Sequence, residues 1–432
     1  MASTALTRSI SSTSTINKFT LSMWIKRGVV SANYPRLFTS NGGTGDTYLR
    51  FNNDDTLEWS GDASNASSAG YLITNRKFRD PLAWYHIVIQ FDSTQGTTAN
   101  RLKLYVNGVQ EISFSTQTLP NQNVTDKIVD TSKVHRIGGN AGSADSFFDG
   151  SMSHFHFTQG YSYAASTFGS TDSTTGEWTI NTSPSLTMGT NGFTILKDGK
   201  TITDQSANSN NFSLASGTLT KTEDCPSNVF ATNNPLCNIA SRWTKTNGNN
   251  TIQHANSGAW TAMISSISSS VGKYYMEAKI TGGASRSMFG VMSADTKIMG
   301  YQTNLTTICL YYNLSGGEFQ QSGGTTSGNN YGTFADNDIA GIAVDCTNNK
   351  LSIYKNGSAL VTNHTIPATV NGFIGFGFTS DSNSTIYQCN YGNGIFGTTS
   401  VSSAGTNASG IGIFEYDVPS GYTALSTKGL NL

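Results

Sequence analysis

The sequence predicts an all-β protein built from two β-sandwiches. The prediction comes from two stretches, 84–108 and 339–357, which share one pattern. In each, an apolar run ends in an aspartate (Asp92, Asp345), a polar turn follows, and a second run closes as Leu-x-[Leu/Ile]-Tyr-x-Asn-Gly. This is the pattern of a β-hairpin, and two copies indicate two domains of one architecture. The length agrees, because 432 residues suit two sandwiches of roughly 200 residues each.

The composition favours short strands and many turns. The chain has 45 glycines, 11% aromatic and only 12% charged residues, with a formal net charge of −1. This charge excludes the positive footprint of a nucleic-acid-binding or anionic-membrane-binding protein. No apolar run of about 18 residues is present, so we expect no membrane insertion. The first residues lack the apolar core of a signal peptide, so we expect synthesis in a cytoplasm.

The first half of the chain is predicted to be a meander of strands. Residues 1–18 form a tether or an edge strand, and residues 19–25 alternate between apolar and polar side chains, as a strand does. In the hairpin 84–108, Asn107-Gly108 supplies the positive φ angles of a tight turn. The other strands that we expect are short and separated by turn-forming residues: 34–38, 48–51, 56–59, 134–139 and 148–157.

The second half is predicted to repeat this architecture from residue 241. Residues 315–332 are rich in Gly, Ser and Asn and indicate an exposed loop. The strands that we expect are apolar or alternating runs: 272–280, 288–292, 308–312, 339–345, 350–355 and 373–378.

Two sequence motifs resemble known families. The start Trp84-Tyr85-His86, the strand ending in Asp92 and the run 104–108 resemble the concanavalin A-like jelly roll of laminin-G and pentraxin domains. The second copy, preceded by Gly272-Lys273-Tyr274-Tyr275-Met276-Glu277, resembles a SPRY domain, a relative of the same sandwich. The resemblance implies two concanavalin A-like jelly-roll β-sandwiches joined by an irregular connector, with these boundaries: laminin-G-like 19–185, connector 186–240 and SPRY-like 241–432.

The connector resembles that of phage fibre and appendage proteins. Residues 204–212 have the pattern D-x-S-x-N-x-N-N-F, and Cys225-Pro226-Ser227-Asn228 follows. This resemblance implies a virion protein, a fibre or knob assembled in the host cytoplasm and exposed on the particle. Its partners would be capsid, portal or tail proteins and a host-surface glycan, and a homotrimer is expected by analogy. Two alternatives are a capsid decoration or cement protein without a ligand, and a cellular lectin or adhesin.

We expect binding rather than catalysis. Glycosidases of this architecture carry Glu-x-Asp-x-x-Glu on one strand, a string that this chain lacks. Saccharides are held by hydroxyl and amide groups and by aromatic rings in loops at the rim of a sandwich. The competing interpretation is that these aromatic residues belong to the core. The candidate saccharide-binding residues are Tyr48, Trp59 and Tyr71, with Asn52 and Asp54 beside them, and in the second half Tyr301, Tyr312, Asn330 and Tyr331.

No cofactor is expected from the residues alone. Laminin-G relatives often hold Ca²⁺ through loop carboxylates, and the resemblance makes Asp54, Asp55 and Asp92 the candidate ligands. Ordinary turns use the same residue types, so the competing interpretation is three turn residues.

Overall fold

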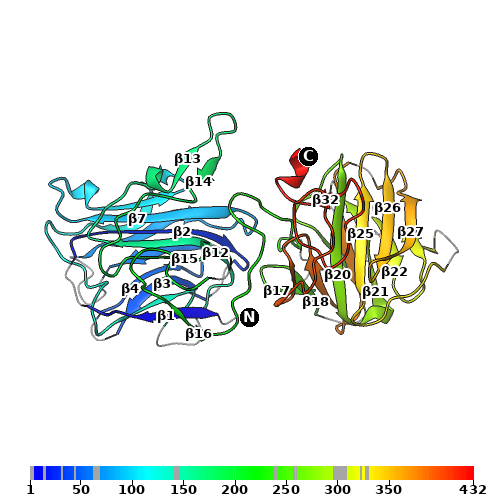
Figure 1. The fold of residues 1–432 in the computed structure, drawn as a ribbon, viewed down its shortest axis with the longest axis horizontal. Coiled ribbons are helices and arrows are strands. Elements are labelled where there is room, and N and C mark those ends of the chain that lie inside the picture. Colours follow the sequence, from blue (N-terminus) through cyan, green and yellow to red (C-terminus); the bar gives the residue numbers. More distant parts are fainter. Residues whose placement is uncertain are drawn as a thin grey trace. The chain divides into compact units, whose positions relative to one another are not determined.

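The fold was obtained as a computed structural model. It describes residues 4–432 except 13–15, 31–32, 43–44, 62–68, 141–145, 198, 200, 238–241, 256–257, 259, 295–308, 322–323, 326–329 and 371. The chain divides into two compact units, residues 1–219 and 220–432, and each is a β-sandwich (Figure 1). Within these described residues, no helix has the length and apolarity needed to cross a bilayer. The short 3₁₀-helices are Thr98–Asn100, Ala165–Thr167, Ala284–Arg286 and Gly429–Asn431.

The first unit packs an eight-stranded sheet against a six-stranded sheet. The eight strands, in spatial order, are β10 (Phe114–Thr118), β6 (Tyr71–Lys77), β5 (Thr56–Ser60), β4 (Thr47–Phe51), β3 (Arg36–Asn41), β11 (Val134–Ile137), β1 (Ala5–Ser9) and β16 (Ser213–Ser216). The six are β15 (Phe193–Ile195), β12 (Gly150–Gln159), β2 (Lys18–Arg27), β7 (Trp84–Asp92), β8 (Leu102–Val106) and β9 (Val109–Gln110). The apolar side chains predicted to share one face of β2, Phe19, Leu21 and Met23, are fully buried in the core between the sheets.

The outer face of the six-stranded sheet is also covered. Residues 161–188, here called the first cover segment, contain the hairpin of β13 (Gly169–Thr171) and β14 (Trp178–Ile180), which lies over β7 in Figure 1. Trp178 Nε1 donates to His86 Nδ1 at 3.0 Å, and the two rings stack at 6.0 Å. Phe168 packs on Val88. The segment also reaches β2, where Thr20 Oγ1 donates to the carbonyl of Tyr161 at 3.1 Å, so β2 is buried on both faces although its sequence alternates.

The second unit has the same plan. One of its sheets contains, in order, β17 (Trp243–Thr246), β18 (Thr251–His254), β29 (Ile386–Asn390), β20 (Lys273–Gly282), β25 (Ile339–Asp345), β26 (Lys350–Lys355) and β27 (Ser358–Thr365), with β32 (Thr423–Ala424) beside β20. The other contains β19 (Thr261–Ile264), β28 (Ile374–Ser380), β21 (Ser287–Ser293), β22 (Cys309–Asn313), β23 (Phe319–Gln321) and β24 (Gly324–Thr325). A small hairpin is formed by β30 (Ile395–Phe396) and β31 (Thr399–Ser400).

A second cover segment, residues 401–418, lies on the outer face of β20 and β25. Phe414 and Val418 pack with Tyr275 and Ala343, which alternate with the core residues of these strands. The buried carboxylate of Glu277 accepts hydrogen bonds from the backbone N–H groups of Glu415 and Tyr416, both at 2.8 Å. Burial raises the pKa of Glu277 to about 7, and the two amides oppose this rise. Glu277 therefore holds the segment on the sheet.

The repeated hairpin motif forms the same structure in both units. Asn107 and Asn356 have φ angles of 48° and 47°, and each is followed by a glycine with positive φ, as predicted for a primed turn. The Oδ1 atom of Asn107 accepts from the N–H of His86 at 2.7 Å, and Asn356 accepts from Ile339 at 2.8 Å. Both predicted hairpins are confirmed by their register.

A residue from the cover segment closes each of these turns. A Cβ added to Gly108 would lie 2.3 Å from the Trp178 ring, and one added to Gly357 would lie 2.6 Å from the Tyr416 ring. Glycine is required in both turns because of its φ angle and because an aromatic ring occupies the space beside it.

The structure differs from the expected irregular connector over 186–240. Within it, β15 pairs with β12 and β16 pairs with β1, so residues up to 219 complete the first unit. Strand β1 lies between β11 and β16 rather than at an edge or in a tether. In the 204–212 motif, Asn210 Oδ1 accepts from the buried Arg8 at 2.8 Å, which ties the motif to β1.

Acidification is expected to destabilise the first unit. Burial lowers the pKa of His86, His135 and His156 from 6.5 to about 3. The unfolded chain takes up protons below about pH 6.5 while the folded unit does not, so stability is complete above that pH and is lost as the pH falls toward 3. At pH 5 we expect a loss of about 2 kcal/mol per histidine. Calorimetry of the full chain at pH 7.5 and 5 checks this, because the unfolding transition of the first unit should move to a lower temperature at pH 5. A melting temperature that is the same at both pH values contradicts the prediction.

Replacing Glu277 is expected to release the second cover segment. Glu277→Ala leaves the N–H groups of Glu415 and Tyr416 without an acceptor, at a cost of about 3 kcal/mol. Amide hydrogen exchange should accelerate over 401–418. The control is Glu223→Ala, which removes a carboxylate whose ion pair with Lys221 is partly exposed. Equal protection of 401–418 in both variants would show that Glu277 does not hold the segment.

Candidate functional site

A pocket of about 450 Å³ opens on the eight-stranded sheet of the first unit, over β4, β5, β6 and β10. The core takes Leu49, Phe51, Leu57 and Trp59 from β4 and β5, so the residues between them face outward. The lining combines amide, hydroxyl and charged side chains: Tyr34, Arg50, Asn52, Asn53, Asp54, Thr56, Glu58, Ile73, Thr74, Asn75, Lys77 and Ser115.

The floor of the pocket is organised around the carboxylate of Glu58. Arg50 Nε and Nη2 donate to Oε2 at 3.0 and 2.9 Å, and the hydroxyls of Tyr48 and Tyr71 donate to Oε1 at 2.7 and 2.9 Å. The Glu58 side chain is 2% exposed, so these charge-assisted bonds offset its desolvation. Burial, together with the nearby carboxylate, raises the pKa of both tyrosines. The floor is therefore fixed before any ligand arrives.

Guanidinium groups lie over the faces of the tyrosine rings beside this floor. Arg50 lies 4.8 Å from the ring centroid of Tyr48 and 4.6 Å from that of Tyr34, and Arg36 lies 4.5 Å from the Tyr48 ring. Such cation–π contacts stabilise both partners. Tyr34 has a φ of 50°, which is uncommon for a bulky residue. The rings act mainly as support for the arginines.

Asp54 and Lys77 form the rim at one end of the pocket. Asp54 Oδ1 accepts from the hydroxyl of Thr56 at 2.7 Å, and this bond lowers the pKa of Asp54. The other oxygen, Oδ2, lies 3.7 Å from Lys77 Nζ, and both side chains are about half exposed. Asn75, also exposed, donates to Ser113 Oγ at 3.0 Å. The rim thus offers both donors and acceptors to a ligand.

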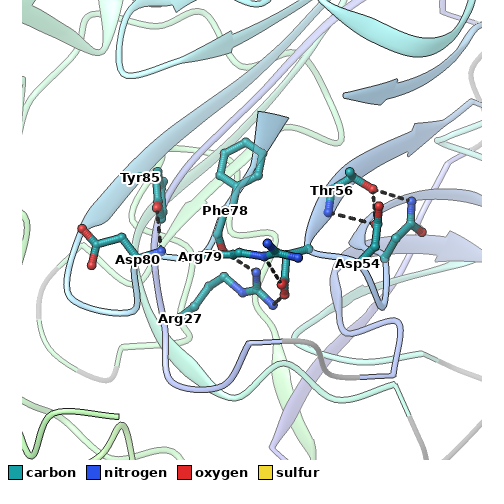
Figure 2. A network of polar contacts seen from close by, with 9 residues as sticks. Arg27, Asp54, Thr56, Phe78, Arg79, Asp80 and Tyr85 are labelled. Carbon is teal, nitrogen blue, oxygen red and sulfur yellow. Dashed lines mark hydrogen bonds and ion pairs between the residues drawn. The ribbon is translucent and has the colours of Figure 1, made fainter. Parts of the chain in front are cut away.

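The neighbouring Asp55 has a structural role. Its buried carboxylate pairs with Arg27 at 2.9 Å and with Arg79 at 3.0 Å, and Arg27 also donates to the carbonyl of Phe78 (Figure 2). Arg27 and Asp55 are both fully buried, so each depends on the other. The pair fixes the β4–β5 turn, which carries Asp54.

The first unit brings together two of its predicted saccharide-binding residues. Tyr48 and Tyr71 meet at Glu58, but with their hydroxyls rather than with free ring faces. Trp59 is 1% exposed and belongs to the core, because it lies one position from Glu58 and faces the other side of the sheet.

The candidates of the second unit are placed differently. Tyr312 is buried in the core and donates to the Gly332 carbonyl at 2.6 Å. Tyr331 packs on Phe319, and the Asn330 side chain accepts from the Gly332 N–H. Tyr301 lies outside the described residues.

The three aspartates expected to bind calcium do not share a site. Asp55 pairs with arginines, and Asp54 bonds to Thr56. Asp92 accepts from Thr94 and Gln95 at the end of β7 and pairs with Lys18 at 3.4 Å. Across the described part of the chain, no group of three or more His, Cys, Asp and Glu side chains could hold a metal ion.

The sequence indicates Asn52 and Asp54, which both line the pocket, but it missed most of the other lining residues. Arg50 and Glu58 could have been found, because the alternation in β4 and β5 places them on the outer face with Tyr48. Asn75, Lys77 and Ser115 come from β6 and β10, and no pattern within either strand indicates that they meet the β4–β5 turn.

Comparison with known proteins identifies the fold of the first unit. Residues 3–167 match a family model described as the concanavalin A-like lectin/glucanases superfamily. This confirms the expected concanavalin A-like domain. No curated protein matches the chain.

Solved structures that match part of the chain include the SPRY domain of human HERC1, at 15% identity over 36% of this chain and 96% of that chain, with a TM-score of 0.31. Another human SPRY domain is 15% identical over 34% of this chain and 94% of that chain, with a TM-score of 0.28. The native heptameric SAP-like pentraxin of Limulus polyphemus is 18% identical over 36% of this chain and 69% of that chain, with a TM-score of 0.26.

Removing the charge of Asp55 is expected to destabilise the first unit. Asp55→Asn keeps the shape and tolerates the φ of 71° but leaves Arg27 buried without a counter-ion, at a cost of about 3 kcal/mol. Calorimetry of the full chain should show a lower melting temperature for the transition of the first unit and no change in that of the second. The adjacent variant Asp54→Asn is the control, since Asp54 is half exposed, and it should cost under about 1 kcal/mol. Equal effects of the two variants contradict the assignment.

Proposed function

We propose that the first unit binds a saccharide in the pocket over β4, β5, β6 and β10. The observation that carries this proposal is a pocket of about 450 Å³ with a fixed polar floor in a concanavalin A-like domain. A pocket of this volume is within the range of small-molecule sites, roughly 300–1,000 Å³.

The chemistry of the lining suits a ligand rich in hydroxyl groups. Each sugar hydroxyl both donates and accepts a hydrogen bond, and the rim supplies both kinds of partner through Asp54, Asn75 and Lys77. The floor is held by Arg50 and Glu58, so binding orders few additional side chains. Saccharide recognition here depends on polar contacts more than on aromatic stacking, because guanidinium groups already lie over the tyrosine rings.

We propose binding without hydrolysis. A glycosidase needs one carboxyl group that gives up a proton and a second that acts as nucleophile or base. The carboxylate of Glu58 accepts hydrogen bonds from Arg50, Tyr48 and Tyr71 on both oxygens, which leaves it no role as an acid. Asp54 alone cannot supply both functions.

We propose further that the protein is a virion appendage that carries this site to a host-surface glycan. The support is the resemblance of the 204–212 motif to phage appendage proteins and the tandem of two sandwiches. Capsid, portal or tail proteins would be its partners on the particle, and a homotrimer is the proposed assembly. A decoration protein without a ligand is the alternative, and saccharide binding decides between them.

Blocking the pocket is expected to abolish saccharide binding. Glycan-array binding by the full chain should be lost, by about tenfold or more, in Ile73→Trp, which fills the pocket from β6. The control, Leu214→Trp, places the same ring on exposed β16 of the same sheet. A chelator should have no effect, because Asp54, Asp55 and Asp92 have protein partners. Silence of the folded wild-type chain would favour the decoration protein.

A further inference from the structure

We propose that the pocket selects an uncharged sugar residue, one of whose hydroxyls bridges Asp54 and Lys77. This inference rests on the proposed saccharide function and names the ligand class. It is carried by two features of the lining, its charge balance and the distance between these two side chains.

The charges of the lining are balanced in pairs. Two cations, Arg50 and Lys77, and two anions, Asp54 and Glu58, line the pocket, so their formal charges sum to zero. Arg50 pairs with Glu58 at 2.9 Å, and Lys77 lies 3.7 Å from Asp54. An anionic sugar at either cation would meet the repulsion of the carboxylate beside it, Asp54 next to Lys77 and Glu58 next to Arg50.

The spacing of Asp54 and Lys77 fits a hydroxyl group. A distance of 3.7 Å is too long for a direct hydrogen bond, so Lys77 Nζ has a donor and Asp54 Oδ2 an acceptor position to offer. A hydroxyl oxygen between them accepts from the ammonium group and donates to the carboxylate. A carboxylate or sulfate has no proton to donate, so it cannot satisfy Asp54.

Arg50 is a poor anchor for an anion, because Glu58 already pairs with its charge. Its Nε and Nη2 atoms are bonded to Glu58, and its guanidinium lies over the rings of Tyr34 and Tyr48. Arg36, which lies over Tyr48 and does not line the pocket, is a neighbouring cation that favours the rival ligand class, an acidic saccharide.

The test uses the full chain and a glycan panel of matched pairs, neutral oligosaccharides and their sialylated, sulfated or uronic acid counterparts. Binding is measured at about 0.02 M and about 0.5 M salt. We expect the neutral member of a pair to bind about tenfold more tightly, with less than about a twofold change between the two salt concentrations. Preference for the acidic members, weakened by salt, overturns this inference and leaves the proposed function standing. Absence of all binding, or binding that Ile73→Trp does not reduce, overturns the proposed function itself.

Two variants test the bridging hydroxyl. Lys77→Met should weaken neutral binding by about tenfold, and Asp54→Asn, which leaves the pocket with a net positive charge, should shift the ratio of acidic to neutral binding toward the acidic member by about tenfold. The control is Asp172→Asn, in the exposed turn of β13 and β14, which should change neither value. An unchanged ratio in Asp54→Asn, with the protein folded, contradicts the proposed bridge.

Discussion

Each unit depends on covering the outer face of one of its sheets. A sandwich buries only the inner faces, and an apolar outer face must find another partner. In both units the partner is a cover segment with little regular structure, 161–188 in the first and 401–418 in the second. A polar group on a central strand fixes each segment to the sheet. In the first unit the group is His86, bonded to Trp178, and in the second it is Glu277, bonded to backbone amides. Burial under the cover segments lowers the pKa of His86 and raises the pKa of Glu277.

The hairpins and the all-β architecture could be predicted because they are local. Alternation over 84–108, ending in Asn-Gly, specifies both the strands and the turn from neighbouring residues alone. The covers could not be predicted, since 161–188 has no period that indicates which sheet it contacts. The role of 186–219 was missed for the same reason: β15 and β16 are short, and their partners lie far away in the chain.

In the candidate site, too, local alternation predicts some features, and contacts between distant strands determine the others. Residues on β4 and β5 follow the alternation, which places Glu58 outside and Trp59 inside, so Trp59 is a core residue in spite of its aromatic ring. The rings of Tyr48 and Tyr71 make them candidates for stacking on a sugar, whereas in the structure their hydroxyls hold a carboxylate. Their function is set by a buried charge on another strand, which composition and spacing do not reveal.

The pairing of β1 with β16 has a mechanical consequence. The two strands are antiparallel, and Ala5 lies opposite Ser216, so both ends of the first unit leave the sheet at the same end of one strand pair. Tension along the chain would therefore open this pair one hydrogen bond at a time, beginning near Thr4 and Thr218, instead of shearing all its bonds together. The buried contact of Arg8 with Asn191 and Asn210 lies further along, where it would resist the opening. Under load, the first unit would yield first at β1 and β16, at the far side of the sheet from the strands of its pocket.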